Sequence, residues 1–216
     1  MNSFETLTDL QIIERILNGE KALYEIIVRR YNPYLYKIGR SYDYGHEDTQ
    51  DLMQDTFIDA YKSLSQFEGR SNFKTWIIRI MMNNSYRKRE KSGFKNEIMT
   101  ENINEQATPM FNSSENNTGK VVHNRELGNV IETSLRKIPF DYRIVFSLRE
   151  MNGLGVSETA NILDISESNV KVRLNRAKAM LKNEIQKEYT AEELFEFNLV
   201  YCNAMVERVM KKINEL

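Results

Sequence analysis

Apolar residues recur at helical spacing along most of the chain, and the breaks between them separate successive helices. The first helix is predicted to begin at Thr8, which forms a capping box with Gln11, and to end at Asn18 and Gly19. A second helix follows, with apolar residues at positions 23, 26, 27, 31, 34, 35 and 38, and Pro33 should kink or restart it. The pattern predicts an all-α fold.

The amino-acid composition agrees with a helical protein. The chain of 216 residues contains nine Gly and three Pro, whereas strong helix formers are plentiful. No apolar run approaches the roughly 20 residues that cross a bilayer, and the first residues lack the basic start and apolar stretch of a signal peptide. We therefore expect a cytoplasmic protein with no membrane insertion.

Cysteine and histidine are too scarce to suggest a metal site. Cys202 is the single cysteine and cannot form an internal disulfide. His46 and His123 lie far apart and show no zinc-binding spacing. We expect no metal, no cofactor and no enzymatic activity.

The net charge of −1 hides a strong segregation of charge along the chain. Six acidic residues and no Lys or Arg lie between Asp43 and Asp59, whereas Arg70 to Lys95 holds eight basic residues against one acid. A second basic block runs from Lys171 to Lys187. This alternation suggests two surfaces that face DNA and a separate acidic surface for another partner.

The acidic stretch is predicted to form a helix with its carboxylates on one side. At about 100° per residue, Asp48, Asp51, Asp55 and Asp59 fall within an arc of roughly 80°, opposite the apolar positions 53, 57, 60, 61 and 64. Such a row is often only a solvated face. It can also dock a basic partner, because like charges repel one another. Paired carboxylates for hydrolysis are a third alternative, although no pocket signal accompanies them.

The next segment combines aromatic residues with cations and amides. A polar turn at 69–72 lies between Phe67 and a helix that should begin near Phe73, and it is a candidate recognition loop. Trp76, Ile77 and Ile80 are expected in the core rather than stacked on bases. The polar positions of the helix are Arg79, Asn83, Asn84, Arg87, Lys88 and Arg89. This mixture is typical of surfaces that bind single-stranded DNA.

Residues 156–182 carry the most informative motif. A short helix from Val156 to Leu163, a turn of about four residues and a longer basic helix suit a helix-turn-helix. Asp164 stands where this turn commonly has Gly, which adopts the left-handed conformation more easily, and Ser166 or Ser168 should cap the longer helix. The polar side of that helix carries Ser168, Lys171, Val172, Asn175 and Arg176, flanked by Asn169 and Arg173. An amphipathic surface helix of a bundle is the alternative.

Taken in order, these motifs resemble the extracytoplasmic-function (ECF) subfamily of the sigma-70 family of bacterial RNA polymerase sigma factors, from about Thr8 to Glu188. ILNGEKALYEIIVRRYNPYLYKI and DLMQDTFIDAYKSLSQFEGRSNFKTWIIRIMMNN resemble the first conserved domain of that family. IPFDYRIVFSLREMNGLGVSETANILDISESNVKVRLNRAKAML resembles the second. The resemblance implies a protein that directs core RNA polymerase to promoters and melts the minus-ten element.

The family's organisation implies two small helical domains. They are a sigma-2-like helical bundle over 5–95 and a sigma-4-like helix-turn-helix domain over 121–188. Residues 96–120, rich in Glu, Asn, Ser and Thr, should form a flexible linker, and 189–216 should form a C-terminal helical extension. The two promoter elements lie about two helical turns apart, near 70 Å, and about 25 extended residues can span that distance.

The resemblance also implies roles for individual residues. The acidic helix would dock on the clamp helices of the largest polymerase subunit through Asp48, Asp51, Gln54 and Asp55. The minus-ten element would be melted, and an unstacked base captured, by Phe67, Arg70, Ser71, Asn72, Phe73, Lys74, Arg79, Asn83, Asn84 and Arg87. The minus-thirty-five element would be read by Ser168, Asn169, Lys171, Val172, Arg173, Asn175 and Arg176.

Further partners follow from the same resemblance. They are the flap of the second polymerase subunit, promoter DNA, and an anti-sigma factor that would hold the protein at the membrane. A LuxR-like helix-turn-helix regulator is the main rival, since it shares the second domain but needs neither the acidic helix nor the melting segment. A nucleic-acid-processing enzyme is a second rival, and it lacks a metal or nucleophile constellation in this sequence.

The C-terminal extension has one apolar face. Positions 195, 199, 202, 206, 209, 213 and 216 follow a 4-3 spacing over three heptads. This helix should either pack on the helix-turn-helix domain or the linker, or bind an anti-sigma factor or another protein. Cys202 lies within the stripe and is expected in its core rather than as a redox sensor.

Overall fold

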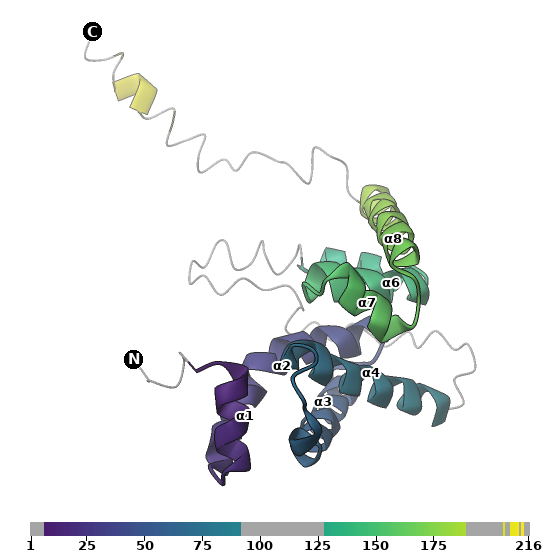
Figure 1. The fold of residues 1–216 in the computed structure, drawn as a ribbon. Helices are drawn as coiled ribbons and strands as arrows, with labels where there is room; N and C mark the ends of the chain where they lie inside the picture. Colours follow the sequence, from purple (N-terminus) through teal and green to yellow (C-terminus); the bar gives the residue numbers. More distant parts are fainter. Residues whose placement is uncertain (1–6, 92–127, 189–204, 206–207, 212, 214–216) are drawn as a thin grey trace.

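The structure is a computed structural model that describes residues 7–91, 128–188, 205, 208–211 and 213. The first segment contains α1 (Asp9–Leu17), α2 (Tyr24–Ser41), α3 (His46–Lys62) and α4 (Phe73–Lys91), with short turns η1 (Lys21–Leu23) and η2 (Leu64–Gln66). The second contains a helix over 128–136, α6 (Phe140–Phe146), the π-helical turn η3 (Ser147–Met151), α7 (Val156–Leu163) and α8 (Glu167–Glu188). Figure 1 shows these two groups of helices against each other. Every element of the described segments is helical, as predicted.

Helix α1 begins and ends where its sequence indicates. Thr8 accepts a hydrogen bond from the backbone N–H of Gln11, and the Gln11 side chain accepts one from the backbone N–H of Thr8. Asn18 is the C-cap, and Gly19 follows with φ of +109°. That φ favours glycine, which has no Cβ to clash. The predicted capping box and stop are confirmed.

Helix α2 is continuous through Pro33, so of the two predicted outcomes, a kink or a restart, the restart does not occur. Proline removes one backbone donor from a helix, but the residues around it are held by burial. Tyr31, Leu35 and Ile38 are each at most 4% exposed and belong to the main core. Tertiary packing thus outweighs the local helix-breaking signal.

Gly39 marks the closest approach of α2 to α3. A Cβ at this position would lie 2.5 Å from Cγ2 of Thr49 and 3.2 Å from Cε of Met81. Thr49 is fully buried in α3, so it has little room to move. The small residue is therefore what lets these two helices pack this tightly.

Replacing Gly39 with Ala should destabilise the protein even though Ala is the better helix former. The added methyl group overpacks the contact, which costs about 1 to 3 kcal/mol, whereas helix propensity returns about 1 kcal/mol. Urea denaturation of the full chain should show a net loss of unfolding free energy. Adding Thr49→Ser, which removes the nearest methyl group, should recover most of it. An unchanged or increased stability of Gly39→Ala would contradict the close approach.

The largest core is shared by both groups of helices. Most of it comes from α1 to α4, and it also contains Ile144, Leu148 and Leu154 from the second group. A smaller cluster beneath the helix-turn-helix contains Val145, Ala160 and Val170. The second group is therefore anchored on the first by buried apolar side chains as well as by its own core.

The helix-turn-helix adopts the predicted boundaries. Helix α7 spans Val156–Leu163, and Asp164 takes the left-handed conformation, with φ of +53° and ψ of +47°. Ser166 accepts a hydrogen bond from the backbone N–H of Asn169 at 3.2 Å and so caps α8. Asp164 thus forms the tight turn without glycine.

The proposed linker, residues 96–120, lies outside the described residues. So does most of the C-terminal extension, including Cys202. In its described part, residues 205, 208–211 and 213 are helical, and Val209 and Ile213 are 45% and 52% exposed. These two residues of the predicted apolar stripe are therefore exposed, and packing on the helix-turn-helix domain or the linker, like binding of another protein, stays a prediction for the extension.

Candidate nucleic-acid interface

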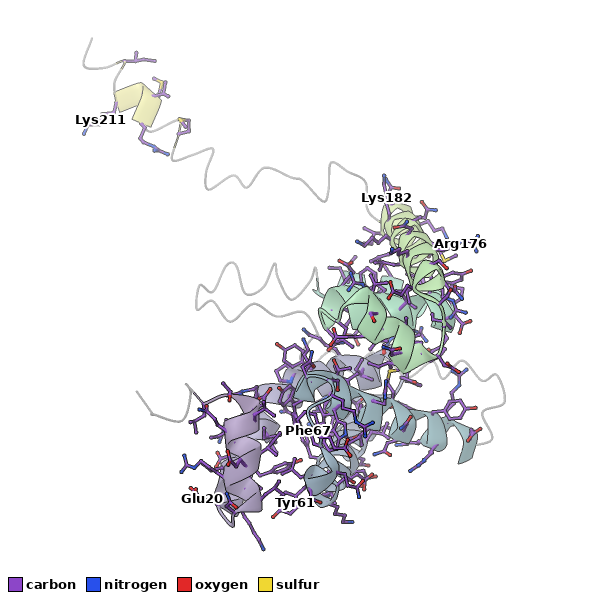
Figure 2. The ribbon with its side chains drawn as sticks, viewed as in Figure 1. Glu20, Tyr61, Phe67, Arg176, Lys182 and Lys211 are labelled. Atoms are coloured by element: carbon purple, nitrogen blue, oxygen red, sulfur yellow. The ribbon has the colours of Figure 1, made fainter. Side chains whose placement is uncertain are left out.

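Helix α8 presents a polar face to solvent. Ser168, Lys171, Asn175 and Arg176 are exposed, and Val172 is 47% exposed between them. The opposite side is fixed in the core by Val170 and Ala177, which are fully buried. Figure 2 shows Arg176 and Lys182 projecting from α8, well away from Phe67. The face combines donors for base edges and phosphates with one methyl-bearing side chain suited to thymine.

Two of these side chains are oriented by neighbours. Arg173 donates from Nε to Oδ1 of Asn169 at 3.1 Å and lies 3.6 Å from the carboxylate of Asp141. The side chain of Arg173 is 25% exposed, less than the rest of the row. Arg176 donates to the hydroxyl of Tyr142 at 3.4 Å. Partial immobilisation lowers the entropy that these arginines lose when they bind.

A second candidate surface is a cavity beside the loop before α4. It has a volume of about 590 Å³ and lies within the range of small-ligand pockets. Phe67 forms one wall and packs against Trp76, with ring centroids 5.4 Å apart. The lining residues are Gln66, Phe67, Glu68, Arg70, Ser71, Trp76, Arg79 and Asn161. Aromatic walls with a cationic rim suit a flipped base.

Several residues predicted to contact the minus-ten element make contacts within the protein. Lys74 donates to the backbone carbonyl of Asn152, and Arg79 donates to that of Asn161 at 3.3 Å. Phe73 is 2% exposed and packs against Phe67, so it supports the loop and has no free face for DNA. Asn72 caps α4 by accepting from the N–H of Thr75 at 2.7 Å. Asn84 donates to Asp59 at 3.0 Å and links α4 to α3.

Arg70, Ser71, Asn83 and Arg87 are exposed, as a contact with DNA requires. Arg70 pairs with Glu68 at 2.5 Å, but its side chain is 83% exposed and remains accessible. The predicted core residues of α4 lie in or against the main core. Ile77 is buried, Trp76 and Ile80 are half-buried and pack against it, and Ile78, Met81 and Met82 complete the buried side.

The acidic face of α3 divides into an inner and an outer pair. Asp48 forms an ion pair with Lys88, and Asp59 accepts from Asn84, so these two carboxylates hold α3 to α4. Asp51 and Asp55 are exposed, as is Gln54, and among the described residues these side chains make no hydrogen bond or ion pair. Of the four residues predicted to bind the polymerase, Asp51, Gln54 and Asp55 are thus unpaired among the described residues, whereas Asp48 is 48% exposed and paired with Lys88.

Sequence patterns did not reveal a large apolar groove between α2 and α3. Its volume is about 1040 Å³, and Gln50 and Gln54 form part of its edge beside the acidic face. Tyr24, Tyr36, Phe57 and Tyr61 contribute aromatic walls, and burial raises the pKa of Tyr24 and Tyr36. A period-2 or period-3.6 pattern cannot show this groove, because its two sides come from different helices.

The described residues contain no group of three or more His, Cys, Asp or Glu side chains arranged to hold a metal ion. Over the same part of the chain, no helix has the length and apolar character of a membrane span.

Comparison with known proteins links both groups of helices to one family. The family model for sigma-70 region 2 matches residues 27–94, and that for sigma-70 region 4 matches residues 129–181. The first match covers the acidic helix and α4, which a LuxR-like regulator would not need. The second covers α8 up to Leu181.

Curated relatives match nearly end to end. The ECF RNA polymerase sigma-E factor of Haemophilus influenzae is 28% identical over 185 residues, covering 84% of this chain and 97% of the relative. The factor of the same name from Escherichia coli K12 is 29% identical over 188 residues, covering 84% and 96%.

Two solved structures share the fold. CnrH in complex with the cytosolic domain of CnrY has a TM-score of 0.59 at 21% identity, covering 82% of this chain and 97% of that one. The sigma factor RpoE of Bartonella quintana, in complex with the anti-sigma factor NepR, has a TM-score of 0.57 at 21% identity, covering 76% and 96%. With both sigma-70 regions in order, and sigma factors matched along most of its length, the chain belongs to the ECF subfamily of the sigma-70 family and is an RNA polymerase sigma factor.

Proposed function

We propose that this sigma factor reads the minus-thirty-five element with the exposed face of α8. The observation that carries this role is the row of Ser168, Lys171, Val172, Asn175 and Arg176, which faces solvent while Val170 and Ala177 fix the helix from behind. Lys171 and Arg176 supply charge for phosphates or guanine edges, and Val172 supplies an apolar contact for a thymine methyl group. Ser168 and Asn169 lie in the first turn, where backbone N–H groups favour a phosphate.

The minus-ten element is proposed to bind at the loop 67–72 and along α4. The cavity bounded by Phe67, Trp76 and Arg79 would receive one unstacked base. Asn83 and Arg87 follow along the exposed side of α4, where they would contact the separated strand. Extracting a base costs a few kcal/mol, and stacking on an aromatic ring returns about 1 to 3 kcal/mol per base.

The core polymerase is proposed to dock on α3 and the adjoining groove. Asp51, Gln54 and Asp55 are exposed and free of contacts among the described residues, and the groove beside them is apolar. A charged edge next to an apolar centre matches the anatomy of protein interfaces. The partner would be the clamp helices of the largest subunit, while the second domain would contact the flap of the second subunit.

Replacing Asp51 and Asp55 together with Asn should weaken binding to core RNA polymerase about five- to thirty-fold, or roughly 1 to 2 kcal/mol. The change removes two charges from a face that makes no internal ion pair among the described residues, so folding should be unaffected. A titration of labelled sigma factor with core enzyme measures the affinity, and run-off transcription measures the activity. Glu14→Gln, an exposed charge change on α1, is the control. Unchanged affinity of the double variant would refute this docking face.

An anti-sigma factor is the proposed regulatory partner. Both structural neighbours with the same fold were solved in complexes, CnrH with CnrY and RpoE with the anti-sigma factor NepR. We infer that this chain acts in the cytoplasm without catalysing a reaction, and that such a factor can hold it at the membrane. Co-purification with a membrane protein that releases the sigma factor on induction would support the last point.

A further inference from the structure

One exposed aromatic side chain on α4 has no role in the binding surfaces proposed above. Tyr86 is 57% exposed, and the other exposed aromatic residue of the described segments, Tyr61, lines the groove between α2 and α3. A single exposed apolar side chain needs no explanation by itself. The neighbours of Tyr86 on the helix decide whether it belongs to a functional surface.

Tyr86 lies on the face of α4 that is proposed to bind DNA. The other exposed residues of α4 between positions 79 and 90 are Arg79, Asn83, Arg87 and Glu90. At about 100° per residue, these residues and Tyr86 fall within an arc of roughly 100°, and Tyr86 lies within about 20° of Arg79. The ring is therefore part of the same row as the cations and the amide of that face.

The helix beneath Tyr86 is held in place by contacts with the preceding helices. Ser85 is fully buried, and its carbonyl accepts a hydrogen bond from the hydroxyl of Tyr44 at 2.8 Å. Lys88 forms an ion pair with Asp48 of α3. A fixed helix presents the ring in a defined place, which lowers the entropy lost on binding.

The hydroxyl of Tyr86 is already engaged within the protein. It donates a hydrogen bond to the carboxylate of Glu90, one turn further along α4, and this bond raises the pKa of Tyr86. The exposed ring is then the part of the side chain that is available to DNA. Such a ring is suited to stacking on a base rather than to hydrogen bonding with a base edge.

The place of Tyr86 along α4 determines which part of the promoter the ring would meet. Arg79 lines the cavity that is proposed to receive the unstacked base. Tyr86 follows Arg79 by seven residues, a rise of about 10 Å along a helix. Stacked nucleotides of one strand are about 3.4 Å apart, so this rise corresponds to about three base steps.

The direction of α4 places these base steps on the upstream side of the cavity. The C-terminal end of α4, at Lys91, leads along the chain towards the helix-turn-helix domain, which is proposed to read the minus-thirty-five element. Tyr86 lies nearer to this end than Arg79 does. The ring would therefore meet the DNA where the two strands are still paired.

We propose that Tyr86 acts as a wedge at the upstream edge of the melted minus-ten element, where its ring stacks on the last base pair, about three steps from the captured base. The inference rests on the proposed role of α4 in minus-ten recognition. A side chain inserted at a base step unstacks that step, and the ring replaces part of the lost stacking. Asn83 and Arg87, on either side of Tyr86, contact the backbone at this junction.

Fork-junction DNA, which is paired upstream and single-stranded downstream, tests this position. In holoenzyme assembled from core polymerase and the full-length sigma factor, Tyr86→Ala should weaken the affinity for a cognate fork about tenfold, because it removes the stacking surface. The loss should be largest when the junction lies about three steps upstream of the captured base and should fade as the junction is moved away. Tyr86→Phe keeps the ring and should stay within about twofold of the wild type.

The matched control is Leu17→Ala, which shortens an exposed apolar side chain on α1 and should leave the affinity unchanged. Tyr86 is itself exposed, so circular dichroism should show intact folding of both variants. An equal loss in Tyr86→Phe and Tyr86→Ala would show a contact made through the hydroxyl and would overturn the wedge. A loss in Tyr86→Ala that is the same at every junction position would overturn it as well.

A single-stranded minus-ten oligonucleotide that begins at the captured base separates this inference from the proposed function beneath it. Arg79→Ala should weaken binding of the holoenzyme to both this oligonucleotide and the fork. Tyr86→Ala should weaken binding to the fork alone, because the oligonucleotide has no base pair on which the ring can stack. If Arg79→Ala weakens both but Tyr86→Ala weakens neither, or weakens both equally, only the wedge is refuted. If Arg79→Ala changes neither affinity, the proposed base cavity is refuted, and with it the position of the wedge relative to the captured base.

Discussion

Arg143→Met should lower the unfolding free energy of the full chain by about 2 to 4 kcal/mol, because it leaves one buried and one partly buried carbonyl group without their donor. The guanidinium donates to the carbonyls of Ser41 and Arg136, each at 2.9 Å, and to the carboxylate of Asp43. Methionine fills a similar volume but donates no hydrogen bond. Asp43 stays 42% exposed and can be hydrated, which keeps the loss below that of a fully buried ion pair.

Burying the charged guanidinium of Arg143 costs desolvation free energy, which its hydrogen bonds and the carboxylate of Asp43 offset. Burial is the main cause that lowers the pKa of Arg143, and Asp43 opposes this shift. Urea denaturation followed by circular dichroism measures the loss. Arg29→Met is the matched control, since Arg29 forms an exposed pair with Glu25 and should cost no more than about 0.5 kcal/mol. Equal effects of the two substitutions would show that Arg143 makes no special contribution.

Replacing Lys171 or Arg176 by Ala should weaken the binding free energy for the promoter by about 1 to 3 kcal/mol if that residue reads a base edge. This corresponds to a loss of affinity of roughly five- to 150-fold per residue. The double variant should bind a minus-thirty-five duplex still more weakly than either single variant. Fluorescence anisotropy with the specific duplex and with a duplex of altered minus-thirty-five sequence measures both affinity and selectivity.

The two substitutions can be told apart by their dependence on salt and sequence. Replacing a lysine that binds only phosphate should weaken binding to all duplexes equally and reduce the salt dependence of the affinity by about one unit of slope. Replacing an arginine that reads guanine should instead relax the sequence preference. Lys187→Ala, near the C-terminal end of α8 and paired with Glu184, is the control. If the double variant bound the duplex with wild-type affinity, the proposal that α8 reads the minus-thirty-five element would be refuted.

Local signals predicted much of this fold. The capping box at Thr8, the start of α4 and the bounds of α7 all follow from residues within one or two turns of each other. The helical periodicity of apolar residues in α8 also predicted which of its residues face solvent, because only one side of the helix was apolar. Family resemblance added the order of the domains and the roles proposed for the exposed residues.

Contacts between distant segments were not predictable in this way. Asn72 reads as a polar loop residue, but its amide bonds to a side chain 86 positions away. Phe73 looks available beside the loop until α4 packs it inward against Phe67. Gly39 reads as an ordinary helix position and shows its role only once α3 lies against it. At Pro33 a local signal was misleading, since proline suggested a restart of the helix but α2 continues through it, held by the burial of its neighbours.

The exposed cations of α8 also determine how ionic strength should act on promoter choice. Lys171 is exposed and forms no ion pair with a described residue, so its approach to a duplex releases counterions from the phosphates. That gain is the same for every sequence and shrinks as salt rises, whereas contacts to base edges persist. Moderate salt should therefore weaken non-specific binding to DNA more than it weakens binding to a cognate promoter.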